Sequence, residues 1–420
     1  MRILLAAFAC RPNSASEDQI GWSILKLLSR NHEVGVITHP IRQQGIEQRD
    51  ERELGGRVKF LYAGKKFTWH PVRLVAQIQN RLIYLQWLQD AQRVADGWLR
   101  RETFDLMHHV TITTWRLPPV SNTLGVPLVW GPLGGAATYP SRLLPWLSPV
   151  SQVFEAVRTI SSEISILDPR IRRSAQQAAQ IICVNRETVA LMKKMGKKDE
   201  SNVHLLNAAF FSEGQISQSR EILLRRTAQE PLRAFAGGFL VGSKGIHFAL
   251  HALARVKKAG CRIPFTVASE GPERSFLERK AQELGLGSQV VFRSPFAGHE
   301  YRPALADHNL FLLPSFREGS AITILEAMLC GQVPLVVSSS TQGETVTPAS
   351  GFAVPLESAD QIIGNLASAL LKLAGDPDLR LRMAREAHRR VAEGYSEEHF
   401  RKSLEAIYFL AVNRKAKSTP

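Results

Sequence analysis

The chain has 420 residues, of which 44% are hydrophobic and 22% are charged, and its formal net charge is +15. This length allows two hydrophobic cores rather than one, and the composition excludes a collagen-like or wholly disordered chain. The positive charge favours anionic partners, but the basic residues are spread along the chain without a compact basic run and interleaved aromatics, so we expect no nucleic-acid partner.

The apolar run at the start of the chain is the first predicted element. After Arg2 it spans seven residues, which fits a buried first strand better than an export signal. No apolar stretch approaches the ~20 residues of a membrane-spanning helix. The four cysteines form no C-x-x-C pair, which indicates neither a zinc ribbon nor a disulfide framework. We therefore expect a cytoplasmic protein that can lie on a membrane but does not cross it.

Short β-rich runs alternate with helical patterns in the first half of the chain, which predicts βαβ units and a parallel sheet. The predicted strands span residues 2–9, 33–38, 57–62, 105–110, 127–130 and 180–184. Two further segments, 71–102 and 139–166, combine apolar periodicity with aromatic residues. Core-facing helices are the simpler interpretation of both segments, and a position at a bilayer interface is the alternative.

A polar linker with one short helix is predicted at 212–229, and the alternation then resumes. The second set of strands spans 232–237, 263–268, 289–292, 310–313 and 333–337, and helices over 359–374, 377–393 and 397–412 close the chain. We expect the last helix to pack back on the first domain. The sequence thus predicts an α/β protein of two Rossmann-like domains, residues 1–211 and 230–392, whose strand ends face a common ligand-binding cleft.

Residues 316–328 follow a predicted strand and open a helix. Two carboxylates, Glu318 and Glu326, flank the amides at the start of this helix, which can bind a diphosphate or sugar hydroxyls. Carboxylates accept hydrogen bonds from sugar and ribose hydroxyls. On spacing alone, however, an ordinary helix with an acidic start is the better interpretation.

Together with Ala327-Met328 and the following Gly-x-Val-Pro, the two glutamates resemble the E-x7-E signature of the family-4 retaining glycosyltransferases, and the resemblance extends over nearly the whole chain. It implies the GT-B architecture, a nucleotide diphosphate sugar as co-substrate, and no cofactor or metal. It also implies that Glu326 binds the donor ribose and that Glu318 contacts the transferred sugar. The donor-binding residues at the helix start would be Gly319, Ser320, Ala321, Ile322 and Thr323.

Residues 236–246 resemble the family's segment G-R-L-x-x-x-K-G. Gly238 matches its first glycine. Lys244 matches its lysine, which implies that Lys244 neutralises the departing diphosphate. A solvated loop lysine is the alternative. The family's phosphate-binding arginine is replaced by Phe239, so one of two expected cations is missing.

A third segment, 268–274, resembles the family's G-x-G-P-E motif, with Ser269 in place of its first glycine. The residues after the next predicted strand lie where such enzymes hold the base of the nucleotide. Ser294, Pro295 and Phe296 are therefore candidate contacts with the base.

The first domain resembles a polysaccharide-biosynthesis subgroup of this family. Ala9-Cys10-Arg11-Pro12 and Ser16-Glu17 match its first loop, whereas Ala15, Asp18 and Gln19 depart from it. The missing glycines restrict close approach of the backbone to a phosphate, so the usual donor contact of this loop is in doubt.

Two acceptor-side segments of the subgroup, 104–111 and 130–135, also have counterparts here. A histidine at a strand end can orient the sugar and stabilise the transition state. We favour His109 over His108 for this catalytic role, and a structural histidine is the alternative for each. A D-x-D sequence at 376–378 is better explained as a helix cap than as a metal ligand.

The sequence therefore predicts a retaining glycosyltransferase that transfers a hexosyl unit to a saccharide or polyprenyl-linked acceptor in polysaccharide or glycoconjugate synthesis. The charge also admits peripheral contact with an anionic membrane. Two alternatives stay open: a nucleotide-sugar epimerase of the same architecture, and a degenerate, non-catalytic glycosyltransferase subunit. The substitutions at Phe239, Asp18 and Gln19 favour the latter, and the intact Glu318, Lys244 and Glu326 argue against it.

Overall fold

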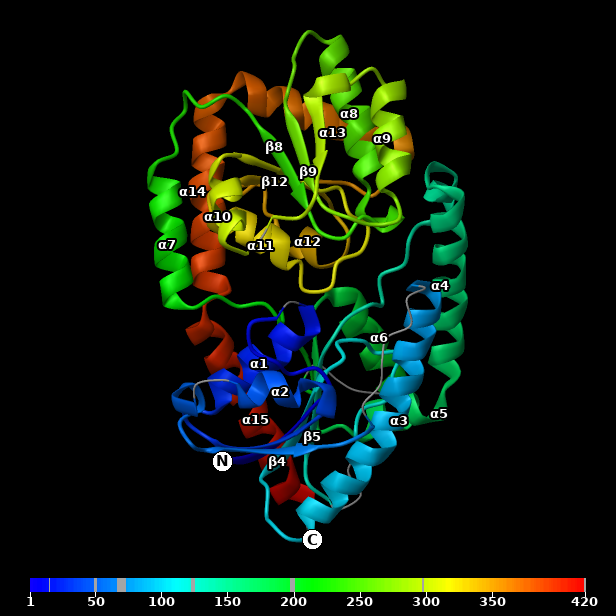
Figure 1. Cartoon of the computed structure of the whole chain (residues 1–420), viewed down its shortest axis with the longest axis vertical. Coiled ribbons are helices and arrows are strands. Elements are labelled where there is room, and N and C mark those ends of the chain that lie inside the picture. The colour runs from blue at the N-terminus through cyan, green and yellow to red at the C-terminus, as the bar shows by residue number, and fades with distance from the viewer. Residues whose placement is uncertain are drawn as a thin grey trace. The chain divides into compact units, whose positions relative to one another are not determined.

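The computed structural model describes residues 1–14, 16–48, 51–65, 73–121, 125–196, 201–296 and 298–418. The chain forms two compact units, each built on a parallel sheet (Figure 1). The first unit comprises Met1–Ala136, Ser162–Ala208 and Phe400–Pro420, and the second comprises Ala137–Ser161 and Ala209–His399. The chain therefore passes from one unit to the other four times.

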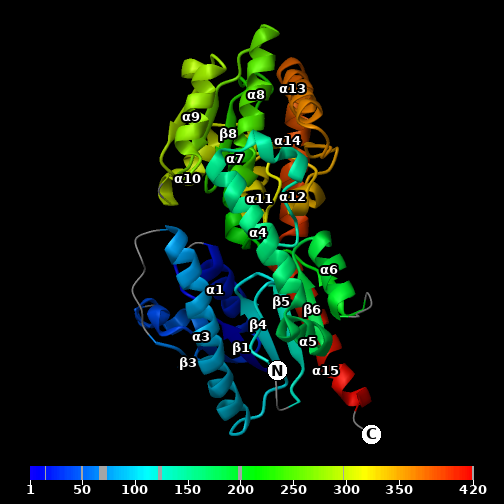
Figure 2. The same cartoon turned by 90° about the vertical axis from the view of Figure 1, so that its right-hand side faces the viewer.

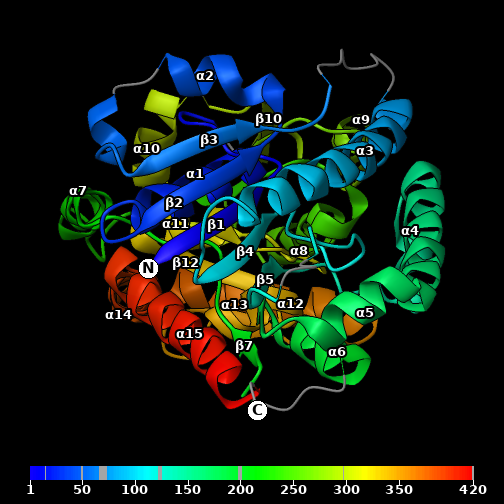
Figure 3. The ribbon, with the colours of Figure 1, turned by 90° about the horizontal axis from the view of Figure 1, so that it is seen from below.

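In its described part, the first unit contains a seven-stranded sheet in the order β3-β2-β1-β4-β5-β6-β7, with every neighbouring pair parallel. Its strands are β1 (Arg2–Ala7), β2 (Glu33–Thr38), β3 (Val58–Tyr62), β4 (Leu106–Thr111), β5 (Leu128–Leu133), β6 (Gln180–Cys183) and β7 (Val203–Leu205). Figure 3 shows β1, β2 and β3 side by side. The central strand β1 is buried from Ile3 to Ala7, as its continuous apolar run requires.

The helices that begin in or belong to the first unit are α1 (Ser16–Leu28), α2 (Gln43–Glu47), α3 (Arg73–Leu99), α5 (Pro169–Gln177) and α6 (Arg186–Gly196), with short turns η1 (Pro40–Arg42) and η2 (Glu51–Leu54). Trp87 and Trp98 of α3 are buried, so these aromatic residues belong to the core rather than to an interfacial surface. The part of the predicted helix before Arg73 lies outside the described residues.

The last helix, α15 (Glu397–Ser418), lies beside α6 and β7 (Figures 2 and 3). Its Tyr408 is fully buried and its hydroxyl lies 2.7 Å from Nδ1 of His108. The other ring nitrogen of His108, Nε2, lies 2.8 Å from the carbonyl oxygen of Gly131. Because a carbonyl only accepts, Nε2 has the proton and Nδ1 accepts the hydrogen bond from Tyr408. This pair fixes α15 to the first sheet.

In the second unit, the described strands form a six-stranded parallel sheet in the order β10-β9-β8-β11-β12-β13. These strands are β8 (Ala234–Gly237), β9 (Phe265–Ala268), β10 (Val290–Arg293), β11 (Leu310–Leu312), β12 (Val333–Val337) and β13 (Phe352–Val354). Each of these strands coincides with a predicted β-rich run, except the short β13, which the sequence analysis did not predict.

Helices cover both faces of the second sheet. In Figure 1, α8 (Ile246–Lys258), α9 (Arg274–Glu283) and α13 (Ala359–Gly375) lie together on one face, and α7 (Glu213–Leu224), α11 (Ile322–Leu329) and α14 (Pro377–Gly394) lie together on the other. The remaining elements are η3 (Ser141–Trp146), η4 (Gly242–Lys244), η5 (Gly287–Gln289), α10 (Gly298–Ala306) and α12 (Ser340–Thr345). The helix α4 (Pro149–Leu167) begins in the second unit and ends in the first.

The domain boundary predicted at residue 211 differs from this division, because residues 137–161 belong to the second unit. Hydrogen bonds explain the assignment. Within the second unit, the hydroxyls of Ser148 and Ser151 donate to the carboxylate of Glu273, and Arg142 donates to the carbonyl of Leu356. The prediction of two Rossmann-like α/β domains is confirmed, since both sheets are parallel and each has helices between its strands.

Candidate functional site

The strand order of the second sheet reverses between β8 and β11. In open parallel sheets, ligands bind outside the carboxyl ends of the strands at such a point. The loop after β8 contains Lys244, and the loop after β11 contains Glu318. Their side chains form an ion pair with Nζ 2.6 Å from Oε1, and only 17% and 8% of the two side chains are exposed. The structure thus brings together two of the residues that the sequence analysis selected.

Close backbone packing holds these two loops against each other. The amide of Phe316 donates to the carbonyl of Ser243 at 2.8 Å, and the hydroxyl of Ser315 donates to the same oxygen at 3.1 Å. Gly245 adopts a φ of +67°, and a Cβ at this position would lie 2.1 Å from the carbonyl oxygen of Pro314. Glycine alone combines a ready left-handed conformation with the absence of a Cβ. Gly245 therefore allows the Lys244 loop to approach the Glu318 loop.

A second ion pair joins the loop that contains Glu318 to helix α4. The guanidinium of Arg317 forms two hydrogen bonds with the carboxylate of Glu155 on α4, at 2.6 and 2.9 Å, and its Nη2 lies 3.3 Å from the hydroxyl of Ser243. Glu155 is 3% exposed. The side chain of Arg317 therefore ties the residues next to Lys244 and Glu318 to α4. Sequence reasoning missed this pair, because Glu155 is 162 residues away from Arg317.

The start of α11 is clamped by the start of α12. The hydroxyl of Ser340 donates to the carbonyl of Glu318 at 2.7 Å and accepts from the Glu318 amide at 3.3 Å, while Thr341 donates to the carbonyl of Gly319. Ala321, the residue that precedes α11, has a φ of +50° and offers no side-chain acceptor to the helix amides. Such a left-handed conformation costs a non-glycine residue roughly 1 kcal/mol.

The other predicted donor-binding residues lie around this point. Gly238 follows β8 with a φ of +107°, and its carbonyl accepts a hydrogen bond from Ser269. Ser320 precedes Ala321 in the loop, whereas Ile322 and Thr323 form the first turn of α11, and the Ile322 side chain is 42% exposed. The helix start is thus partly open to solvent.

Glu326 lies one turn further along α11 and is partly buried. Burial raises the pKa of its carboxyl to about 7, although the Tyr301 hydroxyl and the Arg302 guanidinium of α10 act in the opposite direction. Burial therefore favours the protonated form of this carboxyl well above the pH at which an exposed glutamate ionises. Glu326 can accordingly either donate to or accept from a ligand hydroxyl.

The predicted contacts with a base follow β10, which is separated from β8 by β9. Pro295 is exposed and Phe296 is partly buried. The guanidinium of Arg293 lies 3.7 Å from the centroid of the Phe296 ring, a cation–π contact. These residues are therefore two strands away from the β8 loop that contains Lys244.

His109 lies on β4 of the first unit and is 1% exposed. Its Nδ1 accepts from the amide of Val120 at 3.1 Å, so its Nε2 has the proton and donates to the hydroxyl of Tyr84 at 3.0 Å, which in turn donates to the carbonyl of Pro118 at 2.9 Å. Burial lowers the pKa of His109 to about 3, and His108 contributes in the same direction. Both ring nitrogens of the neutral His109 imidazole therefore already have partners, and one of these hydrogen bonds would have to break before the ring could contact a sugar.

Two residues of the first loop that depart from the subgroup pattern, Asp18 and Gln19, form side-chain hydrogen bonds in the structure. Asp18 accepts from the guanidinium of Arg42 at 3.0 Å, and Gln19 donates to the hydroxyl of Ser23 at 3.0 Å. Ala15 lies outside the described residues. The neighbouring Glu17 accepts hydrogen bonds from the amide and hydroxyl of Thr113, which follows β4.

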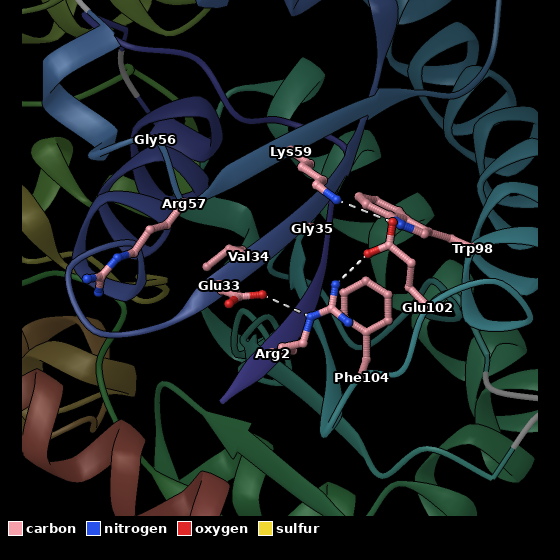
Figure 4. Close-up of a pocket in the computed structure, with 10 residues that line it drawn as sticks. All are labelled: Arg2, Glu33, Val34, Gly35, Gly56, Arg57, Lys59, Trp98, Glu102 and Phe104. Atoms are coloured by element: carbon pink, nitrogen blue, oxygen red, sulfur yellow. Dashed lines mark hydrogen bonds and ion pairs between the residues drawn. The ribbon is translucent and has the colours of Figure 1, made fainter.

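A cavity of about 210 Å³ lies in the first unit near the amino ends of β1, β2 and β3 (Figure 4). Arg2 pairs there with Glu33 at 3.0 Å and with Glu102 at 2.5 Å, and Lys59 lies 3.4 Å from Glu102. These charges hold the amino ends of the strands to the end of α3, and we assign no ligand to this cavity.

The described residues contain no group of three or more histidine, cysteine, aspartate or glutamate side chains that could hold a metal ion. No helix among them is both long and apolar enough to cross a membrane.

The family described as "Glycosyl transferases group 1" matches residues 227–390. These residues form a group 1 glycosyltransferase domain. The chain is 27% identical over 305 residues to the alpha-D-kanosaminyltransferase of Streptomyces kanamyceticus, which covers 66% of this chain and 74% of that protein. The family that the resemblance of the sequence motifs implies is therefore confirmed for this glycosyltransferase domain.

Solved structures show the same fold at low sequence identity. Sucrose-phosphate synthase from Thermosynechococcus elongatus has a TM-score of 0.65 at 16% identity, covering 98% of this chain and 99% of that one. Anabaena HepE in complex with UDP has a TM-score of 0.59 at 16% identity, covering 97% of this chain and 99% of that one. The predicted GT-B architecture is confirmed.

The raised pKa of Glu326 predicts a pH-dependent stability of the glycosyltransferase domain. The pKa rises in the folded state from its ordinary value of 4.5 to about 7, so below pH 4.5 the group is protonated whether the chain is folded or unfolded. Between pH 4.5 and 7 only the unfolded chain ionises to a large extent, and above pH 7 the carboxyl opposes folding by on the order of 3 kcal/mol. We expect Glu326→Gln to raise the melting temperature at pH 8 and to leave it unchanged near pH 4.

Thermal unfolding of both proteins across this pH range measures the effect. Glu221→Gln, at an exposed position on α7, is the matched control and should show no gain at pH 8. An equal rise of the melting temperature in the control, or no rise in Glu326→Gln, would contradict the raised pKa of Glu326.

The buried pair of Glu155 and Arg317 makes a second prediction. Glu155→Gln leaves the Arg317 charge, which is 12% exposed, without a counterion, and we expect a loss of about 3 kcal/mol of stability in denaturant unfolding. The double variant Glu155→Leu/Arg317→Met removes both charges and should lose less than the single variant. Glu53→Gln, which breaks the exposed pair with Lys26, should cost below about 1 kcal/mol. If the double variant lost more stability than the single variant, the unpaired charge of Arg317 would not explain the loss in Glu155→Gln.

Proposed function

We propose that this protein transfers a hexosyl unit from a nucleotide diphosphate sugar to a saccharide or lipid-linked acceptor, with retention of the anomeric configuration. The ion pair of Lys244 and Glu318, at the reversal point of the sheet in a group 1 glycosyltransferase domain, is the main support. The complex of Anabaena HepE with UDP supports a nucleotide donor, because that protein has a similar fold.

The ion pair suggests how the donor is bound. Without a ligand, Lys244 has Glu318 as its counterion. A diphosphate has more than one negative charge, so it can displace the carboxylate from Lys244, and Glu318 then becomes available to accept hydrogen bonds from the hydroxyls of the sugar. The amides at the start of α11 add positive potential at the same place.

In the proposed reaction, the bond between the anomeric carbon and the β-phosphate oxygen breaks. A bond from the acceptor oxygen forms on the same face of the sugar, and the acceptor proton passes to the departing phosphate. The products are a glycoside and a nucleoside diphosphate. Lys244 stabilises the negative charge that develops on the leaving group. Phe239, at the position of the family's arginine, is 48% exposed and has no charge, so Lys244 neutralises the larger share.

Glu326 and the residues after β10 are proposed to hold the nucleoside. The Glu326 carboxyl would bind the ribose hydroxyls, and Phe296 and Pro295 would contact the base. Both segments lie at the carboxyl ends of the strands, the edge at which α/β sheets bind nucleotides. We also propose that His109 contacts the acceptor side of the sugar, once its hydrogen bonds with Tyr84 and Val120 have rearranged.

Calorimetric binding of a panel of nucleotide diphosphate sugars tests the donor site. We expect one donor to bind selectively, and Lys244→Met to weaken its Kd by about 10- to 100-fold, because a charged hydrogen bond is lost. Lys258→Met, at an exposed position on α8, is the matched control and should bind like the wild type.

The products of that donor distinguish the remaining hypotheses. The retaining reaction requires the anomeric configuration of the donor in the glycoside, which NMR coupling constants report, and inversion would overturn it. An epimerised sugar formed from donor alone would instead favour an epimerase. Binding of no donor by the wild type would favour a non-catalytic subunit.

We further propose that the acceptor is presented at an anionic membrane surface. The net charge of +15 supports this proposal. The aromatic residues of α3 do not add to it, because Trp87 and Trp98 are buried.

Flotation with lipid vesicles measures this contact. At low salt, we expect the protein to float with vesicles that contain phosphatidylglycerol, and not with vesicles of phosphatidylcholine alone. High salt should release it, because screening weakens the attraction. Binding that ignores lipid charge, or no binding at low salt, would contradict the membrane proposal.

A further inference from the structure

Helix α4 buries polar side chains and exposes apolar ones, which is the reverse of an ordinary surface helix. Its buried positions include Ser151, Glu155 and Ser165, at 5%, 3% and 2% exposure. The most exposed apolar residues, called here the α4 stripe, are Val150, Val153, Val157, Ile160, Ile164 and Leu167, each at least 56% exposed, and Ile166 beside them is 36% exposed. Scattered apolar residues are normal on a surface, but a continuous row of six along one helix indicates an interaction surface.

The spacing of the α4 stripe identifies the kind of partner. Successive members are separated by 3, 4, 3, 4 and 3 residues. This alternation is the a and d pattern of a coiled coil, in which one helix packs lengthwise against another. Val150, Val157 and Ile164 occupy the a positions, and Val153, Ile160 and Leu167 occupy the d positions.

The charges of α4 do not match a bilayer surface. A helix that lies on a membrane has lysine and arginine beside a wide apolar face that includes aromatic residues. Between Pro149 and Leu167 the sequence has one basic residue, Arg158, which is partly buried, and the exposed charge next to the stripe is the acidic Glu163. A narrow aliphatic row beside an acidic residue fits another helix better than an anionic lipid surface.

The spacing is also the same when it is read in either direction. If two α4 helices lie antiparallel about a two-fold axis near residues 158 and 159, every member of the α4 stripe meets another: Val150 meets Leu167, Val153 meets Ile164, and Val157 meets Ile160. A self-complementary surface of this kind is what a two-fold symmetric dimer requires.

The flanking charges also favour the antiparallel arrangement. In a parallel pair, Glu163 would face Asp168 of the second copy, which places like charges together. In the antiparallel pair, Glu163 faces Ala156 instead. We infer that the protein forms a dimer through the α4 stripe, with the α4 helices of two copies packed antiparallel.

Sedimentation velocity over a series of protein concentrations tests the dimer. The wild-type mass should rise from 46.7 kDa toward twice this value as concentration increases. Val157→Lys/Ile160→Lys should stay at 46.7 kDa at every concentration. The matched control is Leu224→Lys on α7, which is 74% exposed outside the stripe and should dimerise like the wild type. Circular dichroism checks that each variant is folded, and Val157→Ser/Ile160→Ser is the second variant.

Disulfide trapping tests the direction of the helices. In the antiparallel dimer Val157 lies opposite Ile160, so Val157→Cys and Ile160→Cys proteins should form a disulfide when mixed and neither should form one alone. Three native cysteines are buried, and Cys261→Ser removes the partly exposed one. A cross-link of Val157→Cys to itself would overturn the antiparallel arrangement.

Two further outcomes would overturn the dimer itself. One is a wild-type protein that stays monomeric at all concentrations. The other is a monomer whose binding to lipid vesicles is abolished by Val157→Lys/Ile160→Lys but not by Leu224→Lys, since the stripe would then contact lipid rather than a second copy.

Discussion

The reversal of strand order at β8 and β11 is the constraint on which the proposed donor site depends. Neighbouring parallel strands deliver their following loops to the same edge, and Gly245 lets these loops touch. Lys244 and Glu318, 74 residues apart in the sequence, thereby become partners. Each charge is balanced before a ligand arrives, so a ligand must offer Lys244 more than a single carboxylate does. This condition favours the diphosphate that we propose as the ligand.

The local parts of this design could be read from the sequence. Alternating β-rich and helical runs gave both parallel sheets, and short motifs marked Lys244, Glu318 and Glu326. The contacts beneath them could not be read, because the pair of Arg317 and Glu155 joins segments 162 residues apart. No periodicity or motif connects such positions. For the same reason, residues 137–161 were assigned to the domain that precedes them, although their hydrogen bonds hold them to the second.

The chemical state of individual side chains was a further gap. The sequence indicated a histidine at the end of β4, but not the amide of Val120 and the hydroxyl of Tyr84 that fix the proton on its ring. It likewise indicated the position of Glu326 but not its pKa, which burial raises and which Tyr301 and Arg302 of α10 lower. Asp18 and Gln19 looked like losses from a motif, yet each has a local partner.

The passage of residues 137–161 into the second unit has a consequence for recombination between relatives. A crossover within 209–230 would join the glycosyltransferase domain of one parent to Glu155, Ser148 and Ser151 of the other. Arg317 and Glu273 would then meet foreign partners at buried positions, where an unmatched charge is costly. Exchange of donor specificity by a single crossover is therefore restricted to parents that share these residues, and a hybrid of more distant parents needs both segments from one source.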